Sequence, residues 1–220
     1  MRSDICSIPV EEVFEPKEGC PVCRMRDMLE KRMADYITGA AMMEPEIRKV
    51  TNQKGFCFRH FKMILKQQRR LSVALMLESH LKEVEKNLKS PLKSAEKDSC
   101  FICDEVERNM ASLISNTIKK YEADMDFRKL FEQQETLCLK HYYELTAAAD
   151  KKMSRRFKGE FKDAAKKLTL SSIEELHKDV KHFCDMFDYR NNGEDADWGN
   201  SRDSLERSVL FLTSFDPEER

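Results

Sequence analysis

The sequence predicts an all-α protein, and three features support this. The 220 residues include only six Gly and six Pro, which are the residues that loop-rich sandwiches and barrels use heavily. Charged residues make up 36% of the chain, and Leu, Lys, Glu and Met are abundant. Apolar residues recur at helical spacing over long stretches. With 40% apolar residues the chain can bury a core, so we expect a helical bundle.

The first half of the chain predicts three helices in order. An amphipathic helix from Arg24 to Ile37 carries its apolar residues on one stripe. Gly39 ends this pattern, and Pro45 suits the first position of a short second helix. From Phe61 apolar residues recur near helical spacing for about seven turns, up to the polar segment 90–99.

The second half predicts a similar set of helices and a C-terminal extension. A helix follows Cys100, and a long basic helical segment follows His141. The capping box that starts at Ser171 predicts the start of another helix, and a short last helix should begin near Asp203. Trp198 is expected to anchor the polar loop between them.

Six of the eight cysteines and two of the five histidines form a pattern that occurs twice. CPVC at 20–23 is followed by CFRH at 57–60, and CFIC at 100–103 is followed by CLKH at 138–141. The offset is 80 residues for the first pair and 81 for the second, which indicates an internal duplication. The candidate metal ligands are Cys20, Cys23, Cys57, His60, Cys100, Cys103, Cys138 and His141.

The duplication suggests an organisation of the chain. We expect an N-terminal arm at 1–19, a first helical repeat at 20–90, a second at 99–168, and C-terminal helices at 171–220. These parts are expected to form one compact domain. Phe56, Phe58 and Phe61 are candidates to pack around the helix start at the first C-x2-H pair.

The ligand types and spacing predict two zinc ions. A C-x2-C pair and a C-x2-H pair each bring two donors to one ion, and together they complete a tetrahedral Cys3His site. Closure within one repeat is feasible, because a helix of ~21 Å can be followed by an extended return. We therefore describe each repeat as a zinc-stapled helical unit, although exchange of pairs between the two repeats is also compatible with the sequence. An iron–sulfur cluster is the alternative occupant of the same ligands.

The sequence offers no catalytic motif, and we expect a protein that is not an enzyme. CPVC resembles the C-P-x-C of thiol oxidoreductases, but no strand signal precedes it and Phe101 replaces the proline in the second repeat. Phosphate-binding, zincin and nucleophile-elbow motifs are also lacking. A catalytic zinc keeps an open position, whereas each repeat supplies four ligands.

Charge and composition bear on partners and location. The net charge is −1, and nine Lys or Arg against four acids in 139–167 form what we expect to be a solvated helix face. We expect no membrane partner, and a protein partner is favoured over nucleic acid. Nucleic-acid binding through 139–167 is a lesser alternative that only this local charge supports, and the oligomeric state is open. The N-terminus has no apolar signal region and no apolar run nears the ~18 residues of a membrane span, so a cytoplasmic location is expected.

Five of the remaining residues of interest have simpler interpretations. His177 and Cys184 share an apolar face and are expected in the core, and Cys6 has no local partner. Met42 and Met43 could line a groove for a partner helix, although filling an irregular core is the commoner role of methionine.

Several segments resemble a family of bacterial proteins classed as a domain of unknown function. They are IPVEEVFE followed by CPVC, MEPEIRKVTNQKGFCFRHF, and the closing DYRN and WGNSRDSL. The resemblance runs from Ile8 to Leu212 and implies paired CPxC…GFCxxH units but no known activity. Members are sometimes labelled substrate-binding proteins of ABC transporters, a role that this sequence does not support. The leading hypothesis is a structural zinc protein that serves interaction or regulation, and the alternative is a redox or metal-sensing switch.

Overall fold

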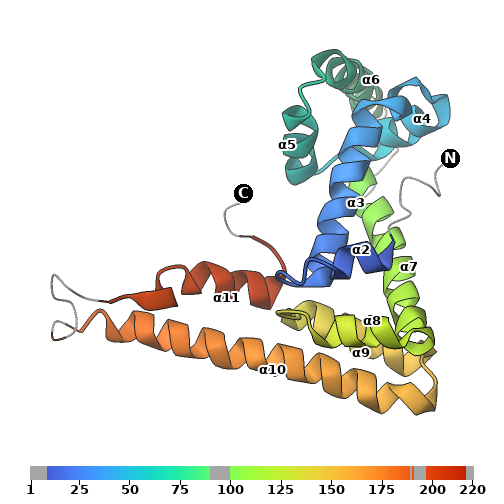
Figure 1. Ribbon diagram of the computed structural model, residues 1–220. Helices are drawn as coiled ribbons and strands as arrows, with labels where there is room; N and C mark the ends of the chain where they lie inside the picture. The colour runs from blue at the N-terminus through green and yellow to red at the C-terminus, as the bar shows by residue number, and fades with distance from the viewer. Residues whose placement is uncertain (1–8, 90–99, 189, 191–196, 217–220) are drawn as a thin grey trace. The chain divides into compact units, whose positions relative to one another are not determined.

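The computed structural model describes residues 9–89, 100–188, 190 and 197–216 (Figure 1). Within these ranges the chain forms ten α-helices and two short 3₁₀ helices and contains no strand. The predicted all-α class is therefore confirmed. The chain divides into two compact units, and the division falls within α3 (Pro21–Thr38) and within α7 (Phe101–Ala123).

Of the described residues, compact unit 1 comprises 26–89 and 100–112. It contains most of α3, the 3₁₀ helix η1 (Ala40–Met43), α4 (Pro45–Lys54), α5 (Phe58–Lys66), α6 (Arg70–Lys89) and the first half of α7. Leu29, Met33 and Ile37 of α3 are at most 3% exposed, so the predicted stripe is a buried face. The short helix predicted at Pro45 is also present, with the proline in its first turn.

The long helix predicted from Phe61 is wrong, because two helices replace it. α5 ends at Lys66, Gln68 has a left-handed backbone with φ of 60°, and α6 begins at Arg70. Arg69 lies between them and donates a hydrogen bond of 2.9 Å to the Asp35 carbonyl near the end of α3. This tertiary contact with a helix C-terminus accounts for the break, which local apolar spacing does not reveal.

Of the described residues, compact unit 2 comprises 9–25, 113–188, 190 and 197–216. It contains α2 (Val10–Phe14), the first turn of α3, the second half of α7, α8 (Met125–Glu132), α9 (Leu139–Lys152), α10 (Arg155–Asp185), the 3₁₀ helix η2 (Gly199–Ser201) and α11 (Ser204–Thr213). Figure 1 shows α9 and α11 lying along α10. An aromatic cluster fills the core, with ring centroids of Tyr121 and Phe161 4.9 Å apart and those of Phe14 and Phe127 5.0 Å apart.

No helix begins at the capping box at Ser171, so that prediction is wrong. α10 runs continuously through it from Arg155 to Asp185. The neighbouring Ser172 hydroxyl donates to the Leu168 carbonyl at 3.0 Å and contacts the Thr136 hydroxyl at 2.6 Å, so it is satisfied inside the helix. His177 and Cys184 are exposed instead of lying in the core.

The C-terminal extension follows the prediction more closely. α11 begins at Ser204, directly after the Asp203 that was expected near its start. The Trp198 ring lies 5.7 Å from the Phe183 ring and 5.9 Å from the Phe187 ring, both on α10. Trp198 therefore anchors the end of its loop on α10 through edge-to-face contacts.

Candidate metal centres

The eight predicted ligands lie in two groups of four. One group contains Cys57, His60, Cys100 and Cys103, and within it the donor atoms all lie within 4.8 Å of one another. The other contains Cys20, Cys23, Cys138 and His141 at the same mutual distances. Of the two pairings that the sequence leaves open, the structure has the exchanged one. Each C-x2-C pair meets the C-x2-H pair of the other repeat.

The exchange places each group inside one compact unit. The 57/60/100/103 group, here called site 1, lies in compact unit 1, and the 20/23/138/141 group, here called site 2, lies in compact unit 2. The boundaries of the compact units therefore differ from those of the sequence repeats.

All four ligand pairs lie at the starts of helices. Cys57 and Cys138 are the N-cap residues of α5 and α9, with extended backbones, and a histidine follows in the first turn of each helix. Cys20 and Cys100 directly precede α3 and α7, whose first turns carry the second cysteine of each pair. The partial positive charge of a helix N-terminus favours the thiolate forms that metal binding requires.

In each compact unit, hydrogen bonds of the residues next to the ligands bring the helix starts together. In compact unit 1 the Phe101 amide donates to the Gly55 carbonyl at 3.1 Å, which joins the start of α7 to the turn before α5. In compact unit 2 the Gly19 amide donates to a Glu135 carboxylate oxygen at 2.5 Å, and the Glu135 amide donates to the Lys17 carbonyl at 3.1 Å. Gly19 and Gly55 both have positive φ, of 55° and 65°, which favours glycine at these turns.

The distances in both groups suit a tetrahedral zinc ion. In site 1 the His60 Nδ1 atom lies 3.2 Å from the Cys57 sulfur, 3.1 Å from that of Cys100 and 3.5 Å from that of Cys103. The sulfurs of Cys57 and Cys103 are 4.0 Å apart. Zinc bonds of ~2.3 Å to sulfur and ~2.0 Å to nitrogen imply tetrahedral edges of about 3.8 Å between sulfurs and about 3.5 Å between sulfur and nitrogen.

Site 2 has the same geometry. The His141 Nδ1 atom lies 3.5 Å from the Cys20 sulfur, 3.3 Å from that of Cys23 and 3.0 Å from that of Cys138. The sulfurs of Cys23 and Cys138 are 3.8 Å apart. In both sites the histidine presents Nδ1 to the sulfurs, so the donor sets match and fit a thiophilic metal ion.

The electrostatics of site 1 favour a cation. Burial opposes a charged His60, but contacts with Cys100 and Glu30 outweigh it and raise the pKa of His60 to about 10. Burial likewise opposes a Cys100 thiolate, yet the His60 contact lowers the pKa of that thiol to about 6. Burial, followed by the charge of Cys100, raises the pKa of Cys103 far above its ordinary value. The sulfurs thus compete for protons, and a divalent cation would relieve their repulsion.

Site 2 shows the same competition. Burial opposes the charged form of His141, but its sulfur contacts raise the pKa of its imidazole to about 9. Hydrogen bonding with Cys20 and Cys23 lowers the pKa of Cys138, and hydrogen bonding with Cys138 and Cys20 raises that of Cys23. In each site the pKa of one thiol is therefore lowered and that of another thiol is raised, while the pKa of the histidine is raised.

The surroundings of the two sites differ. In site 1 Cys57 is exposed, whereas in site 2 Cys20, Cys138 and His141 are all buried. A Ser214 hydroxyl at the end of α11 also lies 3.0 Å from the Cys138 sulfur. Site 2 is therefore the more enclosed of the two.

Each histidine has a glutamate near its Nε2 atom. The Glu30 carboxylate lies 3.7 Å from His60 Nε2, and the Glu144 carboxylate lies 3.9 Å from His141 Nε2. Glu30 is 3% exposed, whereas the Glu144 side chain is 35% exposed. The sequence pattern gave no sign of these residues, because neither belongs to a C-x2-C or C-x2-H pair.

The phenylalanines around site 1 follow the expectation only in part. The Phe56 ring lies 5.4 Å from that of Phe61 and 6.5 Å from that of Phe101. Phe58 is 78% exposed, so its predicted packing role is wrong. Phe58 is the first residue of α5 and is exposed, whereas His60, two residues later, is buried. Cys6 lies outside the described residues.

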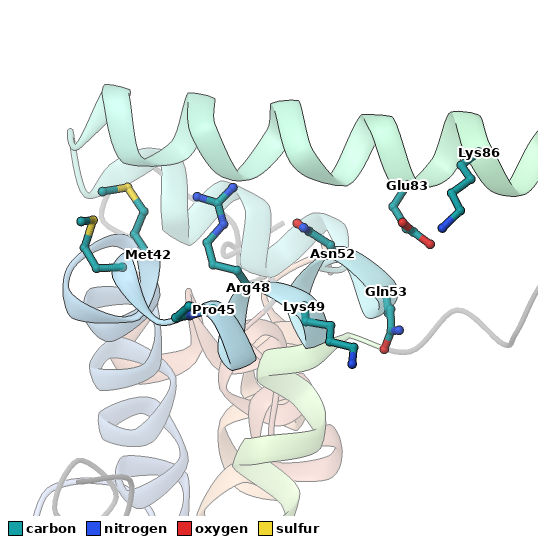
Figure 2. A pocket seen from close by; sticks show the side chains of 9 residues that line it. Met42, Pro45, Arg48, Lys49, Asn52, Gln53, Glu83 and Lys86 are labelled. Atoms are coloured by element: carbon teal, nitrogen blue, oxygen red, sulfur yellow. The ribbon is translucent and has the colours of Figure 1, made fainter.

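A separate groove of about 630 Å³ lies between α4 and α6 (Figure 2). The Arg48 guanidinium crosses it and donates to the Leu75 carbonyl at 2.9 Å and to the Ser79 hydroxyl at 2.6 Å. Met43 at its edge is 77% exposed, so the core role expected for this methionine is wrong. The lining residues are Met42, Met43, Pro45, Arg48, Lys49, Asn52, Gln53, Glu83 and Lys86. None of them is a Cys or His, so the groove is distinct from both candidate metal centres.

The fold and the two Cys3His groups define a duplicated helical protein with two candidate metal centres. The chain belongs to a family of unknown function, DUF6062, whose model matches residues 1–98 and 89–219. The two matches agree with the internal duplication. Comparison with curated proteins and with solved structures found no match. Among the helices of the described residues, none has the length and apolar character needed to cross a membrane.

Proposed function

We propose that each site holds one zinc ion and that the two ions act structurally in a helical interaction or regulatory module. The observation that carries the proposal is the convergence of three sulfurs and one imidazole nitrogen in each site. Thiolate-rich donor sets select zinc, copper(I) or iron–sulfur clusters over calcium and magnesium. Four protein donors fill a tetrahedral shell, which is the arrangement of structural zinc and leaves no position for substrate.

Zinc would tie together helices that are far apart in the chain. Site 1 joins the starts of α5 and α7, and site 2 joins the starts of α3 and α9. Structural zinc in small peptides contributes roughly 10–16 kcal/mol of apparent binding free energy, which is comparable with the stability of a whole domain at about 5–15 kcal/mol. On this account, zinc supplies a large share of the stability of each compact unit.

The helices of such a module would bind a protein partner through their exposed apolar side chains. α6 offers Leu71, Leu81 and Leu88, which are 73%, 62% and 82% exposed. Exposed apolar side chains of this size are a feature of interaction surfaces when they lie close together. The identity of the partner stays open in this proposal.

A redox or metal-sensing switch is the second candidate function, and one observation favours it. The exposed Cys57 has its sulfur 4.0 Å from that of Cys103, so an oxidant could reach this pair of ligands. Loss of the two thiolates would release the metal from site 1 while the more enclosed site 2 kept its own. The switch would use the same ligands as the structural site. Its function would be the release of the metal from site 1, whereas a structural metal stays bound.

Elemental analysis of protein purified without added metal tests the proposal, with a visible absorption spectrum of the same sample. We expect two equivalents of zinc per chain and a colourless solution. Iron with broad visible absorption would overturn the zinc assignment, and a chain without metal would overturn the metal sites. Zinc release in hydrogen peroxide at one site only, reversed by a thiol reductant, would favour the switch over the purely structural role.

A further inference from the structure

We propose that Glu30 is a positioning residue for site 1, because its carboxylate accepts the Nε2 proton of His60 and so leaves Nδ1 free for the metal. This inference rests on the proposed zinc function. It adds a residue that lies outside both ligand motifs and has no counterpart in the second repeat.

The Glu30 carboxylate is held in place by its neighbour on α5. Arg59 donates to one carboxylate oxygen at 2.9 Å through Nη1 and contacts the other at 2.7 Å through Nη2. Such a two-point contact fixes the plane of a carboxylate. Glu30 is only 3% exposed, and a buried carboxylate requires a partner of this kind. Because Arg59 directly precedes His60, the ion pair holds the carboxylate beside the imidazole.

The imidazole of His60 needs a partner at Nε2. Its Nδ1 atom faces the three sulfurs, so a neutral ring that binds metal through Nδ1 must carry its proton on Nε2. That Nε2 atom is buried and makes no hydrogen bond among the described residues. A buried N–H without an acceptor costs about 1–3 kcal/mol. The Glu30 Oε1 atom, 3.7 Å away, is an acceptor that a small rotation of the ring would bring into range.

A metal ion bound at His60 Nδ1 would complete the arrangement of metal, imidazole and Glu30 carboxylate. A ligating histidine commonly donates its other N–H to a carboxylate, which fixes the tautomer and raises the basicity of the ligating nitrogen. Glu30 thus prepares His60 to bind through Nδ1 rather than Nε2.

Site 2 is not built in the same way. Glu144 is three residues after His141 on the same helix and its side chain is 35% exposed, so water can reach it. The positions that the duplication aligns with Glu30 are Met110 and Ala111, which cannot serve as anionic acceptors. The glutamate, arginine and histidine arrangement is therefore specific to site 1.

Zinc affinity of matched variants tests the role of Glu30. The variant Glu30→Met/Arg59→Met removes the acceptor together with its cation, so neither charge is left unpaired. We expect zinc affinity to fall about 10- to 100-fold at one of the two sites, measured by competition with a chromophoric chelator. The single variant Glu30→Gln removes the charge of the ion pair but keeps an amide oxygen that can accept the Nε2 proton of His60, so we expect it to lose less zinc affinity than the double variant, even where thermal stability falls. The control Glu144→Met should leave both affinities unchanged.

The spectrum of ¹⁵N-labelled histidine assigns the effect to a site. In zinc-loaded protein we expect the His60 resonances, but not those of His141, to change in Glu30→Met/Arg59→Met. An equal loss of affinity in Glu30→Gln, which keeps an acceptor, would show that the ion pair is only structural and would overturn the proposal. Wild-type affinity at both sites in the double variant would overturn it as well. A wild-type chain that binds no zinc at all would instead overturn the proposed function.

Discussion

Gly55 shows how strongly a single residue constrains site 1. It stands between α4 and the Cys57 N-cap with φ of 65°, and its carbonyl accepts the hydrogen bond that places the start of α7. A Cβ atom at this position would lie 2.8 Å from His80 Nε2. The His80 ring is itself held by its Nδ1 contact with the Asn52 carbonyl at 2.8 Å, so it has little freedom to move away.

We therefore expect Gly55→Ala to lower the free energy of unfolding by about 2–4 kcal/mol, from the left-handed backbone and the contact with His80 together. Urea unfolding monitored by circular dichroism measures this. Gly159→Ala is the matched control, because a Cβ atom there meets nothing within 4 Å and the residue lies inside α10. The control should raise stability by about 0.5–1 kcal/mol. Equal effects of the two variants would contradict this account of Gly55.

At the residue scale, the sequence predicts the candidate ligands but not their surroundings. The ligand pattern is visible because the same spacing and residue types occur twice, from Cys20 to His60 and from Cys100 to His141. Glu30 and Ser214 are distant in sequence from the motifs that they approach and have no counterpart in the repeat. Their contacts depend on tertiary packing, which residue spacing does not encode.

At the element scale, the four ligand-bearing helix starts share one feature. In each, the amide four residues after the first cysteine of the pair donates to that cysteine's carbonyl. These amides belong to Arg24, Phe61, Asp104 and Tyr142, with N···O distances of 3.2, 2.9, 3.1 and 2.9 Å. No side-chain cap supports the start of α5 or α9. The metal would therefore take the place of a cap in holding these first turns.

Removal of zinc with a chelator should expose these four amides to solvent exchange. We expect their hydrogen-exchange rates, followed by NMR, to rise more than those of the surrounding helices. The Arg128 amide of α8 is the control, because the Asp124 side chain caps that helix through the Asp126 and Phe127 amides. Its exchange rate should rise less than those of the four ligand-linked amides. Uniform exchange across all helix starts would contradict a capping role for the metal.

Helix boundaries were harder to predict than helices. The helix starts at Pro45 and near Asp203 were predicted correctly, because a proline or a polar cap acts within one turn of the helix. The break at Gln68 depends on a contact of Arg69 with α3, and Ser171 lies inside α10 although its sequence resembles a capping box. Tertiary contacts outweighed local preference in both places.

At the scale of the whole molecule, duplication alone does not define the structural units. The sequence repeats begin at the C-x2-C pairs, but the compact units divide the chain after Met25 and after Ser112. Both ways of pairing the ligands satisfy the chain lengths and the ligand chemistry, so the sequence could not choose between them. The structure selects the exchanged pairing, which ties each repeat to the other through both sites.

Zinc stoichiometry of variants that lack whole ligand pairs tests this exchanged pairing directly. One variant replaces both donor pairs of site 1, namely Cys57, His60, Cys100 and Cys103, with Ser and Ala. The account predicts that it keeps one equivalent of zinc, because site 2 is complete. Pairing within each repeat would instead leave this variant with no complete site and no tightly bound zinc.

The companion variant replaces both pairs of the first repeat, which are Cys20, Cys23, Cys57 and His60. The account predicts that this chain loses both zinc ions, because each site then keeps only two donors. Measured by elemental analysis after exhaustive dialysis, one equivalent in the first variant and none in the second is the predicted result. The reverse, none in the first and one in the second, would contradict the exchanged pairing.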